Sequence, residues 1–278
     1  MSSWLQLDSG EDALGRGGAG REPVRVRLPR KRAPKGAELV RLRLPDRPGS
    51  LAAIAGHFAT HAVNVLRLEV LERQTGWAID DFLVSGPGLS AAINELGPDV
   101  ALLSRRPGVD IRDPGLAMAS ACASVTNATT EHQAHGHLVE ASLELVFAEA
   151  GFLCVEKGDG FLRPVASTEP GLPALDADAA SLLSSAVFSG QPLTADGRAP
   201  WAPAAYRDRL PDGAVAVVPG GSGPSLVLAL LRDDPTPFVA AELDRLAALV
   251  SVAAGTFQLH DAGLSPTRGR RLTAEFPL

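Results

Sequence analysis

Cysteine is scarce in this sequence. Among 278 residues only Cys122 and Cys154 are cysteines, and neither stands in a Cys-x-x-Cys pattern. Two such cysteines do not make the disulfide framework of a small secreted protein, and they lack the spacing of paired zinc ligands. We therefore expect both to be small core residues, with no metal site, in a protein of the reducing cytoplasm.

Long apolar runs and an excess of positive charge are also missing. No apolar stretch reaches the length of a membrane span, and the polar segment from Met1 to Arg21 lacks the apolar core of a signal peptide. The formal net charge of -6 gives no overall attraction to nucleic acid or to anionic lipid. We expect no membrane partner, and a nucleic-acid partner is disfavoured.

Motifs of familiar catalytic mechanisms are absent too. The sequence has no Gly-x-Ser-x-Gly elbow and no Gly-x-x-x-x-Gly-Lys phosphate loop. His132, His135 and His137 stand close together, but nothing in the sequence identifies the further ligands that a metal would need. Asp80 and Asp81 adjoin on an expected strand and so point to opposite faces, which makes them a poor acid/base pair. No catalytic residue, no cofactor and no enzyme activity are expected.

The composition changes along the chain and divides it. A hydrophobic content of 45% in 278 residues suffices for one or two folded domains, each with a core. Residues 1–36 are polar and lack periodicity, so we expect a disordered basic lead-in, and residues 262–278 are expected to be a tail. The Pro- and Gly-containing segment 104–119 is expected to join domains at 37–113 and 119–261. The basic residues of the lead-in are Arg21, Arg25, Arg27, Arg30, Lys31, Arg32 and Lys35.

The most informative stretch is residues 39–51, which read Leu-Val-Arg-Leu-Arg-Leu-Pro-Asp-Arg-Pro-Gly-Ser-Leu. Its first part alternates with the period of a half-buried strand and puts Arg41 and Arg43 on the face opposite to the apolar residues. A tight turn follows, in which Gly49 leaves the backbone open to a ligand and Ser50 can cap the next helix. A helix N-terminus with free N–H groups suits a carboxylate.

The elements around this turn follow the order βαββαβ, which is ferredoxin-like. A helix is expected after Ser50, and strands are expected at 63–71 and 77–84. A short helix at 89–96 and a last strand at 109–111 complete the unit. The sequence therefore predicts an α+β fold for this part of the chain.

This segment resembles the ACT domain family. The resemblance covers about residues 38–112 and is carried by Asp-Arg-Pro-Gly-Ser-Leu at 46–51, Val-Asn-Val at 63–65 and Asp-Asp-Phe-Leu-Val at 80–84. ACT domains are small regulatory modules that usually bind an amino acid, often across a dimer interface. The resemblance thus implies an amino-acid ligand, with its carboxylate on the turn's N–H groups and Asp46 available to its ammonium group. The implied ligand-binding residues are Asp46, Arg47, Gly49, Ser50, Leu51 and Asn64.

The second half of the chain has the pattern of an α+β domain in which helices flank an antiparallel sheet. The expected helices span residues 131–150, 177–189 and 238–259. The expected strands, which form two hairpins, span residues 152–156, 161–167, 214–218 and 225–231. Residues 195–211, rich in Pro, Ala and Arg, are expected to be a long loop.

This half resembles the GAF domain, a relative of PAS domains that binds small molecules or serves as a dimerising scaffold. The resemblance covers about residues 119–260, through Phe-Ser-Gly-Gln-Pro-Leu at 188–193, Thr-Pro-Phe at 236–238 and Glu-Leu-Asp-Arg-Leu at 242–246. It implies a cavity between the sheet and the long loop. The loop residues either close over a ligand in a second pocket or pin the loop to the core. They are Trp201, Tyr206 and Arg207.

Together these features predict a non-catalytic homodimer whose ACT-like half senses an amino acid and whose GAF-like half dimerises or relays the signal. Two alternatives stay open. One is a regulatory subunit that gates a partner enzyme of amino-acid metabolism. The other is a nucleic-acid-associated transcriptional regulator that uses the basic residues 21–35.

Overall fold

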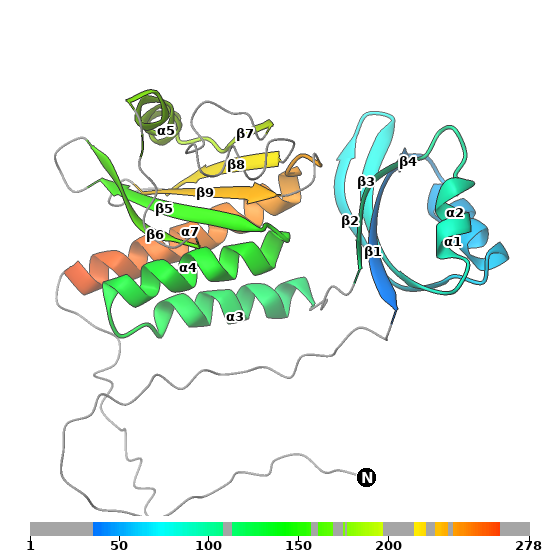
Figure 1. Ribbon diagram of the computed structural model, residues 1–278, viewed down its shortest axis with the longest axis horizontal. Helices are drawn as coiled ribbons and strands as arrows, with labels where there is room; N and C mark the ends of the chain where they lie inside the picture. Colours follow the sequence, from blue (N-terminus) through cyan, green and yellow to red (C-terminus); the bar gives the residue numbers. More distant parts are fainter. Residues whose placement is uncertain are drawn as a thin grey trace, which may run out of the picture.

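The computed structural model describes two folded halves of the chain and the contact between them (Figure 1). The described residues are 36–107, 113–156, 161–168, 175, 177–196, 214–220, 226–232 and 236–261. The lead-in at 1–35, the tail at 262–278 and the loop residues Trp201, Tyr206 and Arg207 lie outside these ranges.

The first half is a four-stranded sheet with two helices on one of its faces. Its elements are β1 (Ala37–Pro45), α1 (Ser50–Thr60), β2 (Asn64–Gln74), β3 (Trp77–Ser85), α2 (Leu89–Asn94) and β4 (Ala101–Pro107). Neighbouring strands are antiparallel and lie in the order β2-β3-β1-β4. The element order βαββαβ is the one that the sequence predicts.

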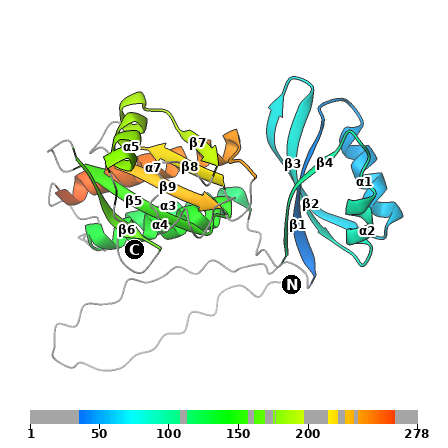
Figure 2. The same ribbon diagram turned by 45° about the horizontal axis from the view of Figure 1, so that its top comes forward.

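The core of the first half lies between the sheet and its own helices. Its buried members are Val40, Leu42, Leu44, Ile54, Phe58, Val63, Phe82, Val84, Leu89 and Ala92. Because side chains alternate along a strand, the remaining residues of β1 and β3 point to the opposite face of the sheet. That face lies towards the second half of the chain in both views (Figures 1 and 2). The first half thus has a core of its own, and the sheet face opposite to its helices lies against the second half.

The last strand of this half differs from the sequence prediction. It is β4, at Ala101–Pro107, whereas residues 109–111 lie outside the described ranges. Residues 104–107 were expected in a linker because Pro107 looked like a strand breaker, but β4 is an edge strand, where proline is tolerated. The predicted linker is therefore shorter at its N-terminal end.

The same linker prediction also fails at its C-terminal end, because a helix, α3 (Pro114–Thr126), begins there. Pro114 is the first helical residue, where the missing N–H has no intrahelical partner to lose. The side chain of Asp113 caps the helix by accepting from the Leu116 N–H at 3.1 Å. Proline thus marks the start of an element here, not an irregular connection.

The second half is a five-stranded antiparallel sheet with helices on both faces. Its strands are β5 (Ala150–Glu156), β6 (Leu162–Ser167), β7 (Leu193–Asp196), β8 (Ala214–Pro219) and β9 (Leu226–Arg232), in the order β6-β5-β9-β8-β7. A layer made of α3, α4 (Glu131–Val146) and α7 (Ala240–Asp261) covers one face, and α5 (Ala177–Ser189) covers the other. Apolar clusters fill both spaces, so this half also has a core of its own.

Most elements of the second half agree with the sequence predictions, and the helix Ala177–Ser189 is confirmed. The predicted helix 131–150 is too long, since α4 ends where Phe147 adopts a left-handed conformation with φ of 54°. The predicted loop 195–211 begins too early, because residues 195–196 pair with β8 as the end of β7.

The described part of the chain is a mixed α+β structure built on two antiparallel sheets. Cys154 is a core residue, as predicted, and burial raises the pKa of its thiol to about 12. Within the described ranges, no helix combines the length and apolar character needed to cross a membrane.

Candidate functional site

The turn between β1 and α1 is shaped by Gly49. This residue takes the N-cap position in the left-handed region, with φ of 91° and ψ of -10°, and no side chain caps the helix. Ser50, predicted as a cap, is instead the first helical residue, and its N–H donates to the Arg47 carbonyl at 3.2 Å. The reason is that the chain enters the helix through a conformation that favours glycine, which has no side chain to donate or accept.

The missing cap leaves backbone N–H groups free at the start of α1. Those of Gly49, Leu51 and Ala52 have no acceptor among the described residues. They lie at the positive end of the dipole of an 11-residue helix. A Cβ added at Gly49 would meet no atom within 4 Å, so a ligand can approach the backbone there. The turn therefore has backbone donors that an anionic group could accept from.

The charged side chains of the turn already have partners. Asp46 accepts a hydrogen bond from Arg73 at 3.2 Å, and Arg47 lies 3.7 Å from Asp99. The Asp46 N–H also donates to the Gly76 carbonyl at 3.2 Å, which ties the turn to the β2–β3 hairpin. Asp46 is thus less available to an ammonium group than its sequence position suggests.

A second carboxylate, Asp80, lies on the same side of the sheet as α1. It pairs with Leu42 near the end of β1, and only 1% of its surface is exposed. Its Oδ1 atom is buried and has no hydrogen-bond partner among the described residues. Burial raises the pKa of Asp80 to about 6, against the lowering effect of Arg73 and with further raising by Asp81 and Asp46.

This end of the sheet therefore offers attraction to charges of both signs. Asp46 and Asp80 carry two negative charges, and Arg73 is the single guanidinium near them. The charge of Asp46 raises the pKa of Asp80, which shows that the two carboxylates are close enough to interact. The free N–H groups of α1 begin a few residues along the chain. A cationic group suits the carboxylates, and an anionic group suits the amides.

Asn64 does not lie at this turn within one chain. Both β1 and β2 pair antiparallel with β3, so they run in the same direction. Asn64 begins β2 opposite Ser85, whereas Pro45 ends β1 opposite Trp77. These positions are the two ends of β3, about 25 Å apart at the usual rise of a strand. The structure thus brings five of the six predicted ligand residues together and separates Asn64 from them.

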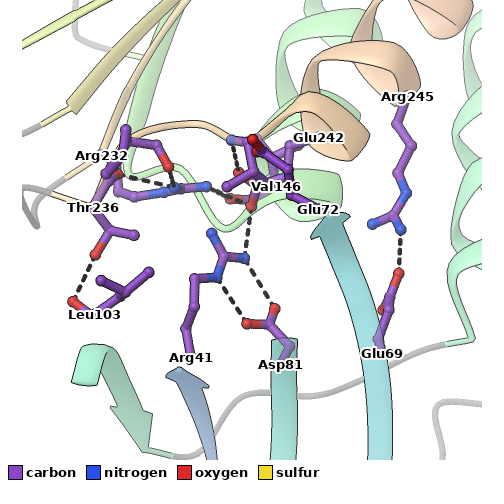
Figure 3. Close-up of polar contacts among 12 residues, drawn as sticks. Arg41, Glu69, Glu72, Asp81, Leu103, Val146, Arg232, Thr236, Glu242 and Arg245 are labelled. Carbon is purple, nitrogen blue, oxygen red and sulfur yellow. Dashed lines mark hydrogen bonds and ion pairs between the residues drawn. The ribbon is translucent and has the colours of Figure 1, made fainter. Parts of the chain in front are cut away.

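On the opposite face of the first sheet, two buried charged residues meet two buried charged residues of the second half, and we call these four the charge cluster (Figure 3). Arg41 of β1 donates to both carboxylate oxygens of Asp81 on β3, at 2.8 and 2.9 Å, and to Glu242 at 2.9 Å. Glu242, in the first turn of α7, also accepts from Arg232 of β9 at 2.8 Å. Their exposed fractions run from 0% to 6%. The cluster therefore joins the two halves through charges shielded from solvent.

Burial and pairing oppose each other in the charge cluster. Burial would raise the pKa of Glu242, but Arg41 and Arg232 outweigh it and hold that pKa below its ordinary value. Burial would lower the pKa of Arg41, yet Asp81 and Glu242 keep it raised. For Arg232 burial prevails, and its pKa is lowered. Pairing thus keeps the Glu242 carboxylate ionised in spite of its burial.

Weaker contacts surround the charge cluster and also join the halves. Val239 packs with Leu71 and Ile79 of the first sheet. The Arg106 guanidinium lies 5.9 Å from the centre of the Phe147 ring. The polar pairs, in part visible in Figure 3, are Arg245 with Glu69, the Ala240 N–H with Glu72 at 3.1 Å, and the Thr236 hydroxyl with the Leu103 carbonyl at 2.8 Å.

Sequence reasoning missed the charge cluster, although a signal was present. It treated Arg41 as part of a polar strand face and Asp81 only as the neighbour of Asp80. Arg232, however, ends a run of apolar residues at 226–231, where a charged side chain is seldom buried without a partner. The partner could not be identified, because Glu242 looks like an ordinary acidic residue in the first turn of a helix.

Two of the three histidines near the start of α4 make contacts within the second half. His135 is buried edge-on against Phe257, with ring centres 4.6 Å apart, and His137 hydrogen-bonds to the Ser124 carbonyl at 2.7 Å. Across the described residues, no group of three or more His, Cys, Asp or Glu side chains is placed to hold a metal ion. His135 and His137 thus take part in packing and helix contacts of the second half.

No protein-family model and no curated protein matches the sequence. Several solved structures are similar over about half of the chain. A GAF domain/HD domain protein from Geobacter sulfurreducens is 26% identical, matches over 48% of this chain and 95% of its own, and has a TM-score of 0.39. The GAF domain of a phosphoenolpyruvate-protein phosphotransferase from Coxiella burnetii is 17% identical, with coverages of 54% and 96% and a TM-score of 0.42. Free methionine-R-sulfoxide reductase from Neisseria meningitidis, solved with its substrate, is 16% identical, with coverages of 55% and 95% and a TM-score of 0.46.

Proposed function

We propose that this chain is a non-catalytic regulatory protein that senses an amino acid through its first half. The ACT-like motifs at 46–51, 63–65 and 80–84 support this assignment, and so does the strand order β2-β3-β1-β4. The GAF-like second half, residues 119–261, dimerises or relays the state of the first. Regulation in this sense requires that the ligand bind two states of the protein unequally.

One observation carries the choice of an amino acid: Asp80 has a buried, unpartnered Oδ1 on the same side of the sheet as α1, whose first N–H groups are free. A buried carboxylate oxygen without a hydrogen bond is costly and therefore uncommon. A ligand ammonium group would pair with it. The ligand carboxylate would accept from the N–H groups of Gly49, Leu51 and Ala52. An α-amino acid carries both groups on one carbon atom.

Calorimetric titration of the full chain with each of the twenty amino acids tests this proposal. We expect at least one to bind, and we expect Gly49→Val to abolish binding because its side chain occupies the approach to the amides. Gly56→Val is the matched control, since an added Cβ at Gly56 in the same helix also meets no atom within 4 Å. The proposal fails if no amino acid binds the natural protein. The site lies elsewhere if a folded Gly49→Val variant binds as before.

We also propose that two copies associate through β2. This strand is an edge of the first sheet, and it exposes Leu66, Leu68 and Val70. Two β2 strands related by a two-fold axis run antiparallel, so the Asn64 end of one would lie beside the Gln74 end of the other. This pairing would bring Asn64 towards the turn of the second copy, which a single chain does not do.

A further inference from the structure

The contact between the two halves is mostly polar and small in its apolar part. Its apolar centre is Val239 packed with Leu71 and Ile79, with Trp77 and Leu103 partly buried beside them. Each half, by contrast, has a separate and larger apolar core that takes nothing from the other half. The folding of each half therefore does not depend on burying this contact, which resembles a polar interdomain contact.

The charge cluster is built so that separating the halves leaves no charge alone. Arg41 and Asp81 both belong to the first half and share two hydrogen bonds. Arg232 and Glu242 both belong to the second half and share a third. Within the cluster, only the bond from Arg41 to Glu242 crosses between the halves. Glu242 would keep a further bond of its own half, from the Val239 N–H at 3.1 Å.

This arrangement differs from an ordinary buried salt bridge between two domains. When the two charges of such a bridge come from different domains, separation exposes both charges without partners, and the penalty locks the domains together. Here each half would take away one complete ion pair. The charge cluster thus resists separation far less than its burial suggests, and the ion pair across the halves outside it, between Arg245 and Glu69, is only partly buried.

The closed contact also contains donors that it does not satisfy. Arg41 Nη1 and Arg232 Nε are buried and have no acceptor among the described residues. Arg41 lies on the sheet face that the second half covers, so separation would let water accept a hydrogen bond from its Nη1 atom, whereas Arg232 keeps its contacts within the second half. The Nη1 atom of Arg41 therefore favours the open form and offsets part of what the cross-half contacts contribute to the closed one.

We infer that this contact is a separable joint: the two halves open and close against each other as a two-state element while each stays folded. In the closed form Arg41 is bound to Glu242. In the open form that bond is broken, while the Arg41–Asp81 pair stays intact in the first half and the Arg232–Glu242 pair stays intact in the second. This inference does not depend on which ligand binds the first half. It goes beyond the sensing role because it names the movement that the second half can respond to.

Val239→Asp in the full chain tests the joint, because it puts a charge into the apolar centre of the contact. Trp77 reports the result once Trp4 and Trp201 are replaced by Phe. We expect acrylamide quenching of Trp77 to rise about two-fold while the far-UV circular dichroism stays unchanged. Val252→Asp, the same change at an exposed position of α7, is the matched control and should change neither signal.

Glu242→Gln is the second variant and decides the matter if Val239→Asp does not fold. It removes the charge that bonds across the halves while keeping the shape of the side chain, so Trp77 quenching should again rise with secondary structure retained. The joint is refuted if quenching stays at the natural level in both variants. It is equally refuted if both lose secondary structure, because the two halves would then be one cooperative core.

Discussion

At the scale of single residues, Asp80 and Asp81 are neighbours on β3 with opposite surroundings. Asp80 has a buried Oδ1 without a partner, whereas both oxygens of Asp81 accept from Arg41. A buried carboxylate costs free energy when it is alone, and it stabilises the fold when a neighbouring cation would otherwise be stranded. The same substitution should therefore have opposite effects at these two positions.

Asp80→Asn should raise the free energy of unfolding by about 1–2 kcal/mol at pH 7.5. The pKa of Asp80 is about 6 in the folded protein against an ordinary value of 3.8, so the folded state holds its proton more tightly. Stability from this group is therefore full below pH 4 and falls as the pH rises through 6. Urea unfolding at pH 4 and pH 7.5 should show a gain for the variant at the higher pH alone.

Asp81→Asn is the matched variant and should lower the free energy of unfolding by about 3 kcal/mol, because the buried Arg41 loses one of its two carboxylate partners and keeps only Glu242. If Asp80→Asn is also destabilising at pH 7.5, then the Asp80 carboxylate has a favourable interaction in the folded protein. That result would contradict its proposed role as an unpaired group that binds a ligand ammonium. The same Asp80→Asn protein should bind the amino acid more weakly, so its gain in stability and its loss of function have one cause.

At the scale of elements, two glycines in and beside α1 test the shape of the turn. Gly49→Ala should lower the free energy of unfolding by about 1 kcal/mol, because φ of 91° strains any residue with a Cβ. Gly56→Ala should raise it by about 0.5–1 kcal/mol, since it replaces an exposed glycine inside the helix. Thermal unfolding of the two variants checks this, and equal shifts of one sign would contradict the left-handed cap.

Hydrophobic periodicity was enough to predict most elements, but not the faces of β2. The alternation of β1 and the helix at 177–189 follow from the pattern of apolar residues. In β2, a bulge between Val65 and Arg67 shifts the register, so Asn64 and Leu68 lie on opposite faces and not on one. A bulge depends on how two strands pair, and the sequence of one strand does not contain that information.

At the scale of the whole molecule, the charge cluster could not be predicted, because its cross-half bond joins residues 201 positions apart. Alternation correctly put Arg41 on the face opposite to the apolar residues. It could not reveal that a second folded half covers this face. The candidate ligand turn, by contrast, is local in sequence, and its motif was therefore recognisable, whereas the burial of Asp80 was not.

The proposed pairing through β2 predicts a dimer that a single charge can disrupt. Light scattering at micromolar concentration should give twice the mass of one chain, and Leu68→Lys should reduce it to that of one chain because a lysine on an edge strand opposes pairing. Leu116→Lys, at a more exposed leucine of α3, is the control and should remain dimeric. A natural protein with the mass of one chain would remove this part of the proposal.

The unsatisfied donors of the charge cluster affect how much free energy a ligand must supply to open the proposed joint. The unpartnered Nη1 atom of Arg41 costs the closed form about 1–3 kcal/mol, which lowers the free energy needed to open the proposed joint. A difference of about 1.4 kcal/mol changes the ratio of the two forms tenfold, which is within the range that a weakly bound metabolite supplies. If every donor of the cluster were satisfied in the closed form, a ligand would need a larger difference in binding free energy to open the joint. In the proposed joint, an incompletely satisfied interior would make the closed and open forms easier to interconvert.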